Sequence, residues 1–181
     1  MKLRTHYILT KIAAEYSGLS FLERSAFCIG SLIPDLSPTQ FIHPHFYARS
    51  AGYVQSRLES TANRGLLARL FEYGKMAHYA SDFCCSVHSS GGVGNVREHI
   101  LYERALNRYA KKNKELLKAE FKGLIKRQSL TAIVNDYRSD KSFDFYTDML
   151  FAVKGCFSIC ERALCVDEPV EKIPLNGLYT T

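Results

Sequence analysis

The stretch from Gly74 to Glu103 constrains this chain most, because it contains two histidine–carboxylate pairs at helical spacing. His78 and Asp82 are four residues apart, as are His99 and Glu103. On an α-helix this spacing places both side chains on one face, one turn apart. A single pair of this kind is common as a helix-surface ion pair, so one pair alone would indicate no function.

A further histidine, His88, lies between the two pairs. Imidazole and carboxylate are the ligands that zinc takes where thiolates are absent, and two ligands on successive turns can hold one ion. The two pairs and His88 all fall within residues 78–103. This density favours a site for more than one metal ion over two unrelated ion pairs.

Apolar residues recur at helical spacing along most of the chain and predict an all-α fold, a multi-helix bundle. Ser20 and Glu23 have the spacing of a capping box, and Gly18 marks the end of the preceding helix. The expected helices are residues 5–17, 20–30, 47–60, 63–86, 93–112, 114–128, 130–137 and 143–164. At 181 residues the chain fits one domain, which we place at 1–165, with an extended tail at 166–181.

Two regions bear on the predicted site. Three prolines within residues 31–47 predict an irregular loop, which carries Asp35, His43 and His45 as further potential ligands. Downstream, a helix at 93–112 antiparallel to the helix before it would bring both histidine pairs to one end of the bundle, with His88 at the joint. On that helix we expect the apolar residues to be buried: Ile100, Leu101, Ala105 and Tyr109.

Composition adds weaker constraints. The net charge of +6 and the isoelectric point near 9.0 favour an anionic partner, although a basic stripe at residues 111–127 is also typical of a solvated helix face. The six cysteines lack C-x-x-C spacing and are expected to be reduced and buried, with Cys156 and Cys160 a minor zinc alternative. No signal peptide or segment of membrane-spanning length is evident, which predicts a cytoplasmic protein.

These residues resemble the bacterial zinc-dependent phospholipase C family, whose fold is shared by the single-strand-specific zinc nucleases. The resemblance covers roughly residues 5–110 and follows the family's order of ligands along the chain. The matching motifs are His6, Pro34-Asp35, His45-Phe46-Tyr47, His78-Tyr79 with Asp82 and His88, and His99 with Glu103.

The resemblance implies a particular set of zinc ligands. One zinc would be held by Asp35, His45, His78 and Asp82, and a second by His88, His99 and Glu103. A third would use His6, with Asp82 bridging; in the family this ion is completed by the amino nitrogen and carbonyl of an N-terminal Trp, and the present chain has no Trp. The His-Phe-Tyr match favours His45 over His43.

The resemblance implies a metal-dependent phosphoric ester hydrolase, phospholipase C-like, with zinc as cofactor and Asp35 as candidate general base. The substrate would be a phosphodiester, either a phospholipid met by peripheral contact with a membrane or a nucleotide. A zinc nuclease or soluble phosphodiesterase, and a non-catalytic metal-binding helical module, remain alternatives. Six aromatic residues could line a pocket for either lipid or bases: Phe41, Phe46, Tyr47, Tyr79, Phe83 and Tyr102. The oligomeric state is left open.

Overall fold

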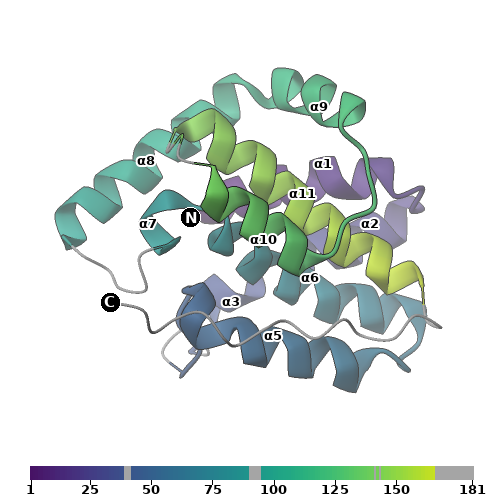
Figure 1. Ribbon diagram of the computed structural model, residues 1–181. Coiled ribbons are helices and arrows are strands. Elements are labelled where there is room, and N and C mark those ends of the chain that lie inside the picture. The colour runs from purple at the N-terminus through teal and green to yellow at the C-terminus, as the bar shows by residue number, and fades with distance from the viewer. Residues whose placement is uncertain (39–41, 90–94, 141, 143, 166–181) are drawn as a thin grey trace.

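The computed structural model describes residues 1–38, 42–89, 95–140, 142 and 144–165, and these residues form ten α-helices and no strand (Figure 1). The predicted all-α class is therefore confirmed. The predicted tail at 166–181 lies outside the described residues. The helices are α1 (Leu3–Tyr16), α2 (Phe21–Gly30), α3 (Ile33–Leu36), α5 (Tyr47–Thr61), α6 (Leu66–Phe83), α7 (Ser86–Ser89), α8 (Val96–Lys112), α9 (Lys114–Gly123), α10 (Leu130–Ser139) and α11 (Phe145–Leu164).

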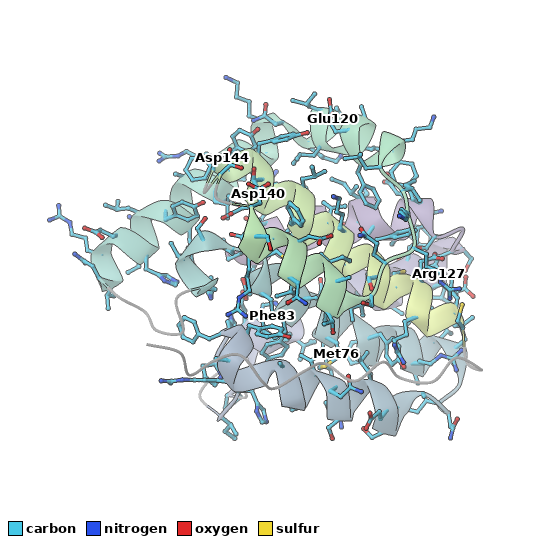
Figure 2. The ribbon with its side chains drawn as sticks, in the orientation of Figure 1. Met76, Phe83, Glu120, Arg127, Asp140 and Asp144 are labelled. Atoms are coloured by element: carbon cyan, nitrogen blue, oxygen red, sulfur yellow. The ribbon has the colours of Figure 1, made fainter. Side chains whose placement is uncertain are left out.

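Helix α6 is the centre of the fold. Every residue from Met76 to Phe83 is buried, because α2, α5 and α11 all pack against this helix. Figure 2 shows the side chains of Met76 and Phe83 among the helices, whereas Glu120 and Arg127 lie at the outside. A polar residue on the second half of α6 therefore faces protein on all sides and needs a specific partner.

Helices α2 and α6 approach backbone to backbone at Gly30 and Gly74. A Cβ atom added at Gly74 would lie 2.1 Å from the carbonyl oxygen of Phe27 and 3.1 Å from Cα of Gly30. No real side chain tolerates that distance, so both positions require glycine. The close approach brings Ser31, at the end of α2, against the middle of α6.

The predicted ends of the first two helices are mostly confirmed. Gly18 has φ +67°, in the left-handed region that glycine favours after a helix end. The capping box is present, with the backbone N–H of Ser20 donating to Oε2 of Glu23 at 2.8 Å. However, α1 begins at Leu3 rather than at Thr5, and Thr5 is buried inside the helix.

Two other predictions of local structure need correction. Residues 33–36 form a helical turn within the predicted loop, because Pro34 suits the start of a helix, where an N–H is not needed. Asp35 therefore lies on a helix. The long helix expected at 63–86 ends at Phe83, and His88 lies on the separate short helix α7.

Helix α8 does not form the predicted hairpin with α6. It packs mainly on α1 and α11, so its buried face is Glu103, Leu106 and Ala110. Ile100 and Leu101, predicted to be buried, are 37% and 51% exposed. The apolar spacing was compatible with burial of either of two faces of the helix. Contact with α1 and α11 buries the face that was not predicted. None of the described helices combines the length and hydropathy required to cross a membrane.

Candidate metal centre

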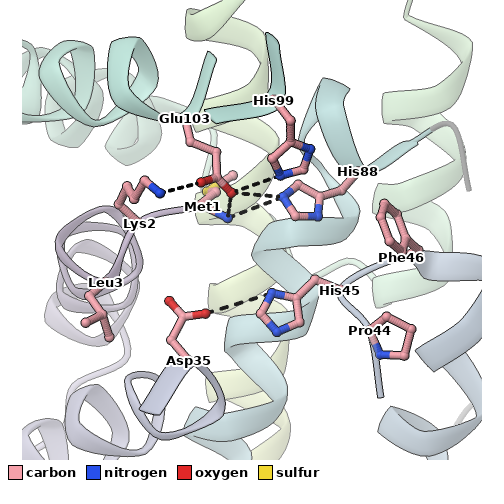
Figure 3. Close-up of a pocket in the computed structure, with 10 residues that line it drawn as sticks. All are labelled: Met1, Lys2, Leu3, Asp35, Pro44, His45, Phe46, His88, His99 and Glu103. Atoms are coloured by element: carbon pink, nitrogen blue, oxygen red, sulfur yellow. Dashed lines mark hydrogen bonds and ion pairs between the residues drawn. The ribbon is translucent and has the colours of Figure 1, made fainter. Parts of the chain in front are cut away.

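All eight side chains singled out in the sequence converge on one region of the bundle, although they come from five helices and the segment before α5. Their potential ligand atoms form three groups, each with all atoms within 4.8 Å of one another. The groups are His6, His78 and Asp82; Asp35, His45 and His78; and His88, His99 and Glu103. Five of the eight line a pocket of about 470 Å³ (Figure 3).

His6 and His78 are fully buried, and each is oriented by a hydrogen bond at Nδ1. His78 Nδ1 lies 2.9 Å from the carbonyl oxygen of Ser31, which can only accept. His6 Nδ1 lies 2.9 Å from the hydroxyl of Ser81, which donates its own proton to the carbonyl of His78. Both rings therefore carry the proton on Nδ1, and Nε2 of each is left as a lone pair facing the cluster.

These two Nε2 atoms are buried and have no hydrogen-bond partner among the described residues, and Oδ2 of Asp82 is buried beside them. A buried unpaired acceptor costs about 1–3 kcal/mol. Two lone pairs and a carboxylate oxygen facing one space are the donor set of a zinc ion. The residues therefore fit the cation that this arrangement implies.

Asp82 connects the groups, since its two oxygens face different histidines. Oδ2 lies 2.9 Å from His45 Nδ1 and 3.5 Å from His78 Nε2. Oδ1 lies 3.7 Å from His6 Nε2 and 3.8 Å from His88 Nε2. Ligands about 2.0–2.1 Å from a tetrahedral zinc are roughly 3.3 Å apart, close to these separations.

Asp35 and His45 complete the group next to His78. Asp35 Oδ1 lies 3.6 Å from His78 Nε2 and 3.9 Å from His45 Nδ1. The other histidine of this segment, His43, instead stacks on the ring of Tyr53 at 3.7 Å. The structure thus places His45 within the cluster and His43 outside the three groups.

The third group comes from α7 and α8. Oε1 of Glu103 lies 3.5 Å from His88 Nε2 and 3.2 Å from His99 Nε2, and Figure 3 shows the three side chains pointing toward one another. With three protein ligands, an ion held here would keep a coordination position open, which is typical of catalytic rather than structural zinc.

The amino group of Met1 lies between the groups. Its nitrogen is 2.6 Å from Asp82 Oδ1, 3.2 Å from Glu103 Oε1 and 3.4 Å from His88 Nε2. Burial by itself would lower the pKa of this group, but Asp82 and Glu103 raise it to about 11. The placement of an amine against two carboxylates indicates that the cluster favours positive charge.

The charge states of the histidines suit metal binding. Burial lowers the pKa of His6 far below its usual value, and neighbouring His78 lowers it further. Burial also lowers the pKa of His78 to about 3 and that of His88. These imidazoles are neutral at pH 7, the form that binds metal. His45 differs: burial would lower its pKa, but the hydrogen bond to Asp82 raises it.

The carboxylates differ from one another. Burial raises the pKa of Asp35 to about 6, with the charge of Asp82 adding to the effect. Burial would also raise the pKa of Asp82, but the Met1 ammonium, His88 and His6 hold it well below its usual value. Glu103 is ionised as well, because His88, Met1 and Lys2 lower its pKa against the effect of burial. The centre combines two permanent anions with a carboxyl group that titrates near neutrality.

An all-helical fold around a buried cluster of imidazoles and carboxylates defines a class of metal-dependent proteins. The chain belongs to the zinc-dependent phospholipase C family, since the family described as zinc dependent phospholipase C matches residues 5–156. The expected resemblance is thereby confirmed. Comparisons with curated proteins and with solved structures found no match. No candidate metal-binding group among the described residues includes a cysteine.

Three features of the centre were missed from the sequence. The Met1 amine and the Ser31 carbonyl are backbone groups, for which no residue type gives a signal. Ser81 follows His78 by three residues, but a serine at that spacing is too common to stand out. What could have pointed to Ser81 is its place between His78 and Asp82.

Proposed function

We propose that this protein is a zinc-dependent phosphodiesterase that cleaves phospholipids as a phospholipase C. The observation that carries the proposal is the set of three candidate metal-binding groups connected through Asp82 beside a pocket. Membership of the zinc-dependent phospholipase C family supports the reaction class. A single structural ion would need neither three groups nor a pocket.

The ligand sets follow the family resemblance, and the distances between the ligand atoms support them. Asp35, His45, His78 and Asp82 would hold one zinc. His88, His99 and Glu103 would hold a second, and His6 with Asp82 would contribute to a third. Bound zinc would lower the pKa of a coordinated water and polarise a phosphoryl oxygen. With five neutral imidazoles and three carboxylates, two zinc ions would leave a formal charge of about +1, which attracts a phosphate ester.

Asp35 is suited to act as the general base. Its side chain is 18% exposed and lines the pocket, so a water molecule can reach its carboxylate. With its pKa raised to about 6, it is ionised at pH 7 and can accept a proton. Lys2 lies at the same pocket, 2.9 Å from Glu103 Oε2, and places a positive charge near an incoming phosphate.

The surroundings of the pocket favour a lipid. Leu3 lines the pocket and is 38% exposed. Leu36 directly follows Asp35 and is 67% exposed, and Ile100 directly follows His99 and is 37% exposed. An exposed leucine that lines the pocket, with exposed apolar residues next in sequence to two of the candidate ligands, suits a substrate with a phosphate headgroup and an apolar remainder, presented at a membrane surface.

The same surroundings argue against a nuclease, which needs exposed aromatic rings on which bases stack. Tyr47, Tyr79 and Phe83 are at most 6% exposed and belong to the core. Phe46 lines the pocket but is also only 6% exposed, with its ring 5.7 Å from that of His88. Phe41 lies outside the described residues. A non-catalytic module is disfavoured by the three-residue group on α7 and α8, which leaves a ligand position open.

A substrate screen combined with elemental analysis tests the proposal. We expect two or three zinc ions per chain, and zinc-dependent hydrolysis of phosphatidylcholine that a chelator abolishes and added Zn²⁺ restores. Asp35→Asn should bring a large loss of the same activity. Cleavage of single-stranded DNA but not of phosphatidylcholine would replace the lipid substrate by a nucleic acid. At most one bound ion, or no hydrolysis of either substrate or of bis-nitrophenyl phosphate, would overturn the proposal.

A further inference from the structure

A second buried carboxylate lies behind the metal centre. Asp148, in the first turn of α11, is fully buried. Its Oδ1 accepts hydrogen bonds from the hydroxyls of Tyr137 at 2.7 Å and Ser86 at 2.8 Å. Its Oδ2 accepts from the Tyr102 hydroxyl at 2.8 Å and the Ser86 N–H at 3.0 Å, and lies 2.9 Å from the Ser86 hydroxyl, whose one proton the two carboxylate oxygens share.

All of these donors are neutral, and the two tyrosines remain protonated. Burial raises the pKa of both Tyr102 and Tyr137, and the charge of Asp148 raises them further. Hydrogen bonds to an ionised acceptor are roughly twice as strong as neutral ones. Asp148 therefore accepts strong hydrogen bonds from residues on three other helices.

Two of those helices carry one whole candidate metal-binding group. Ser86 is the first residue of α7, two positions before His88. Tyr102 is on α8, next to Glu103 and three positions after His99. The third donor, Tyr137, is on α10, which contributes none of the candidate ligands.

The histidines of this group lack the hydrogen bonds that orient His6 and His78. Nδ1 of His88 and Nδ1 of His99 are both buried and have no hydrogen-bond partner among the described residues. The polar contacts that the described residues make with these rings are at Nε2, within the group itself and with Asp82 and the Met1 amine, so the ring positions depend strongly on where α7 and α8 lie. Ser86 on α7 and Tyr102 on α8 both donate hydrogen bonds to the same carboxylate, and their hydroxyls lie 2.9 Å apart.

We propose that Asp148 is a positioning residue for the group formed by His88, His99 and Glu103, and that it acts by anchoring α7 and α8 to α11. The inference rests on the proposed metal centre but not on the identity of the substrate. It distinguishes two roles for the hydrogen bonds to Asp148. Those from α7 and α8 set ligand geometry, whereas the bond from α10 contributes only to stability.

The experiment compares Tyr102→Phe with its matched control Tyr137→Phe. Each change removes one hydroxyl from Asp148 and leaves the ring and the other donors in place. Zinc affinity would be measured by titrating the metal-free protein with Zn²⁺ against a chromogenic chelator, which resolves a tight and a weak class of ion. Urea unfolding of the metal-free variants supplies the measure of stability.

We expect both variants to lose similar stability, but only Tyr102→Phe to weaken one class of zinc ion, by about 10–100-fold, as loss of a hydrogen bond behind a ligand commonly does. Ser86→Ala should act like Tyr102→Phe. Asp148→Asn should weaken the same class and lower stability as well, and any failure of Asp148→Asn to fold leaves the two tyrosine variants as the deciding pair.

Two results would overturn the inference, and they differ in what they mean for the proposed function. In the first result, the wild-type protein binds two or three zinc ions, and Tyr102→Phe and Tyr137→Phe bind them equally well. That result would overturn the positioning role alone. Wild-type protein that binds no zinc would overturn the proposed function, and the positioning role with it.

Discussion

The two helices that carry the histidine–carboxylate pairs hold them by different means. On α6, His78 and Asp82 are fully buried in the middle of the bundle, and a hydrogen bond to the Ser31 carbonyl orients the His78 ring. On α8, Glu103 is 8% exposed, and the ring of His99 lies 3.2 Å from Glu103 of its own pair and 4.8 Å from the ring of His88. A hydrogen bond to a ring atom orients the histidine of the α6 pair, whereas the position of helix α8 determines where its pair lies.

This difference follows from position in the fold. Helix α6 is surrounded by other helices, so each of its polar groups must find a partner or leave a buried atom unsatisfied. Helix α8 packs on α1 and α11 with one face and leaves the other exposed, which is where Ile100 and Leu101 lie. Under the proposed function, the α6 side would hold its ions rigidly, and the α8 side would leave room for a substrate.

The largest expected effect comes from His78→Ala, because His78 belongs to two of the three candidate groups. The variant should lose most of its zinc and all phosphodiesterase activity, as measured by elemental analysis and hydrolysis of bis-nitrophenyl phosphate. His43→Ala is the matched control, since His43 lies outside the groups and should keep both properties. Full activity in the His78 variant would contradict the role assigned to α6.

The next largest effect is expected from Glu103→Ala, which removes a ligand from only one group. We expect loss of the ion held on α7 and α8, retention of those held on α6, and loss of phosphodiesterase activity. Glu98→Ala, an exposed carboxylate on the same helix, provides the control. Equal loss of zinc from the Glu103 and His78 variants would show that the two sides are not independent.

Gly74→Ala tests how the α6 side is built. The new Cβ would lie 2.1 Å from the Phe27 carbonyl oxygen, and separating α2 from α6 should cost about 1–3 kcal/mol of unfolding free energy. The same movement carries the Ser31 carbonyl away from His78, so zinc affinity on the α6 side should fall while that on the α8 side persists. Gly123→Ala, with nothing within 4 Å of its Cβ, should leave stability and affinity unchanged in urea unfolding and Zn²⁺ titration.

The smallest effect is expected from Lys118→Ala, in the basic stripe. Lys118 pairs with Glu15 at 2.6 Å, at the end of α1 opposite to Met1 and about 20 Å along the helix from it. Hydrolysis of bis-nitrophenyl phosphate should therefore match that of the wild type. A marked loss of kcat on this small ester would place the basic stripe in the catalytic apparatus.

Much of the candidate centre could be predicted from local spacing. His78 with Asp82 and His99 with Glu103 stand one helical turn apart, and a helix enforces that relation without help from the rest of the chain. The helical class followed from the same periodicity. The buried face of α8 could not be predicted this way, because its apolar spacing allowed two faces and the choice depended on α1 and α11.

By itself, then, the sequence determined the helical class, the family and the residues able to bind metal, since these depend on residue type and on short-range spacing. Only the tertiary structure shows that His45, which the sequence favoured, lies in the cluster, that the Met1 amine and the Ser31 carbonyl lie against it, and that Asp148 accepts hydrogen bonds from both α7 and α8. The physical reason is that these contacts join residues far apart in the chain. They exist only where helix packing, such as the backbone contact between Gly30 and Gly74, brings the partners within hydrogen-bonding distance.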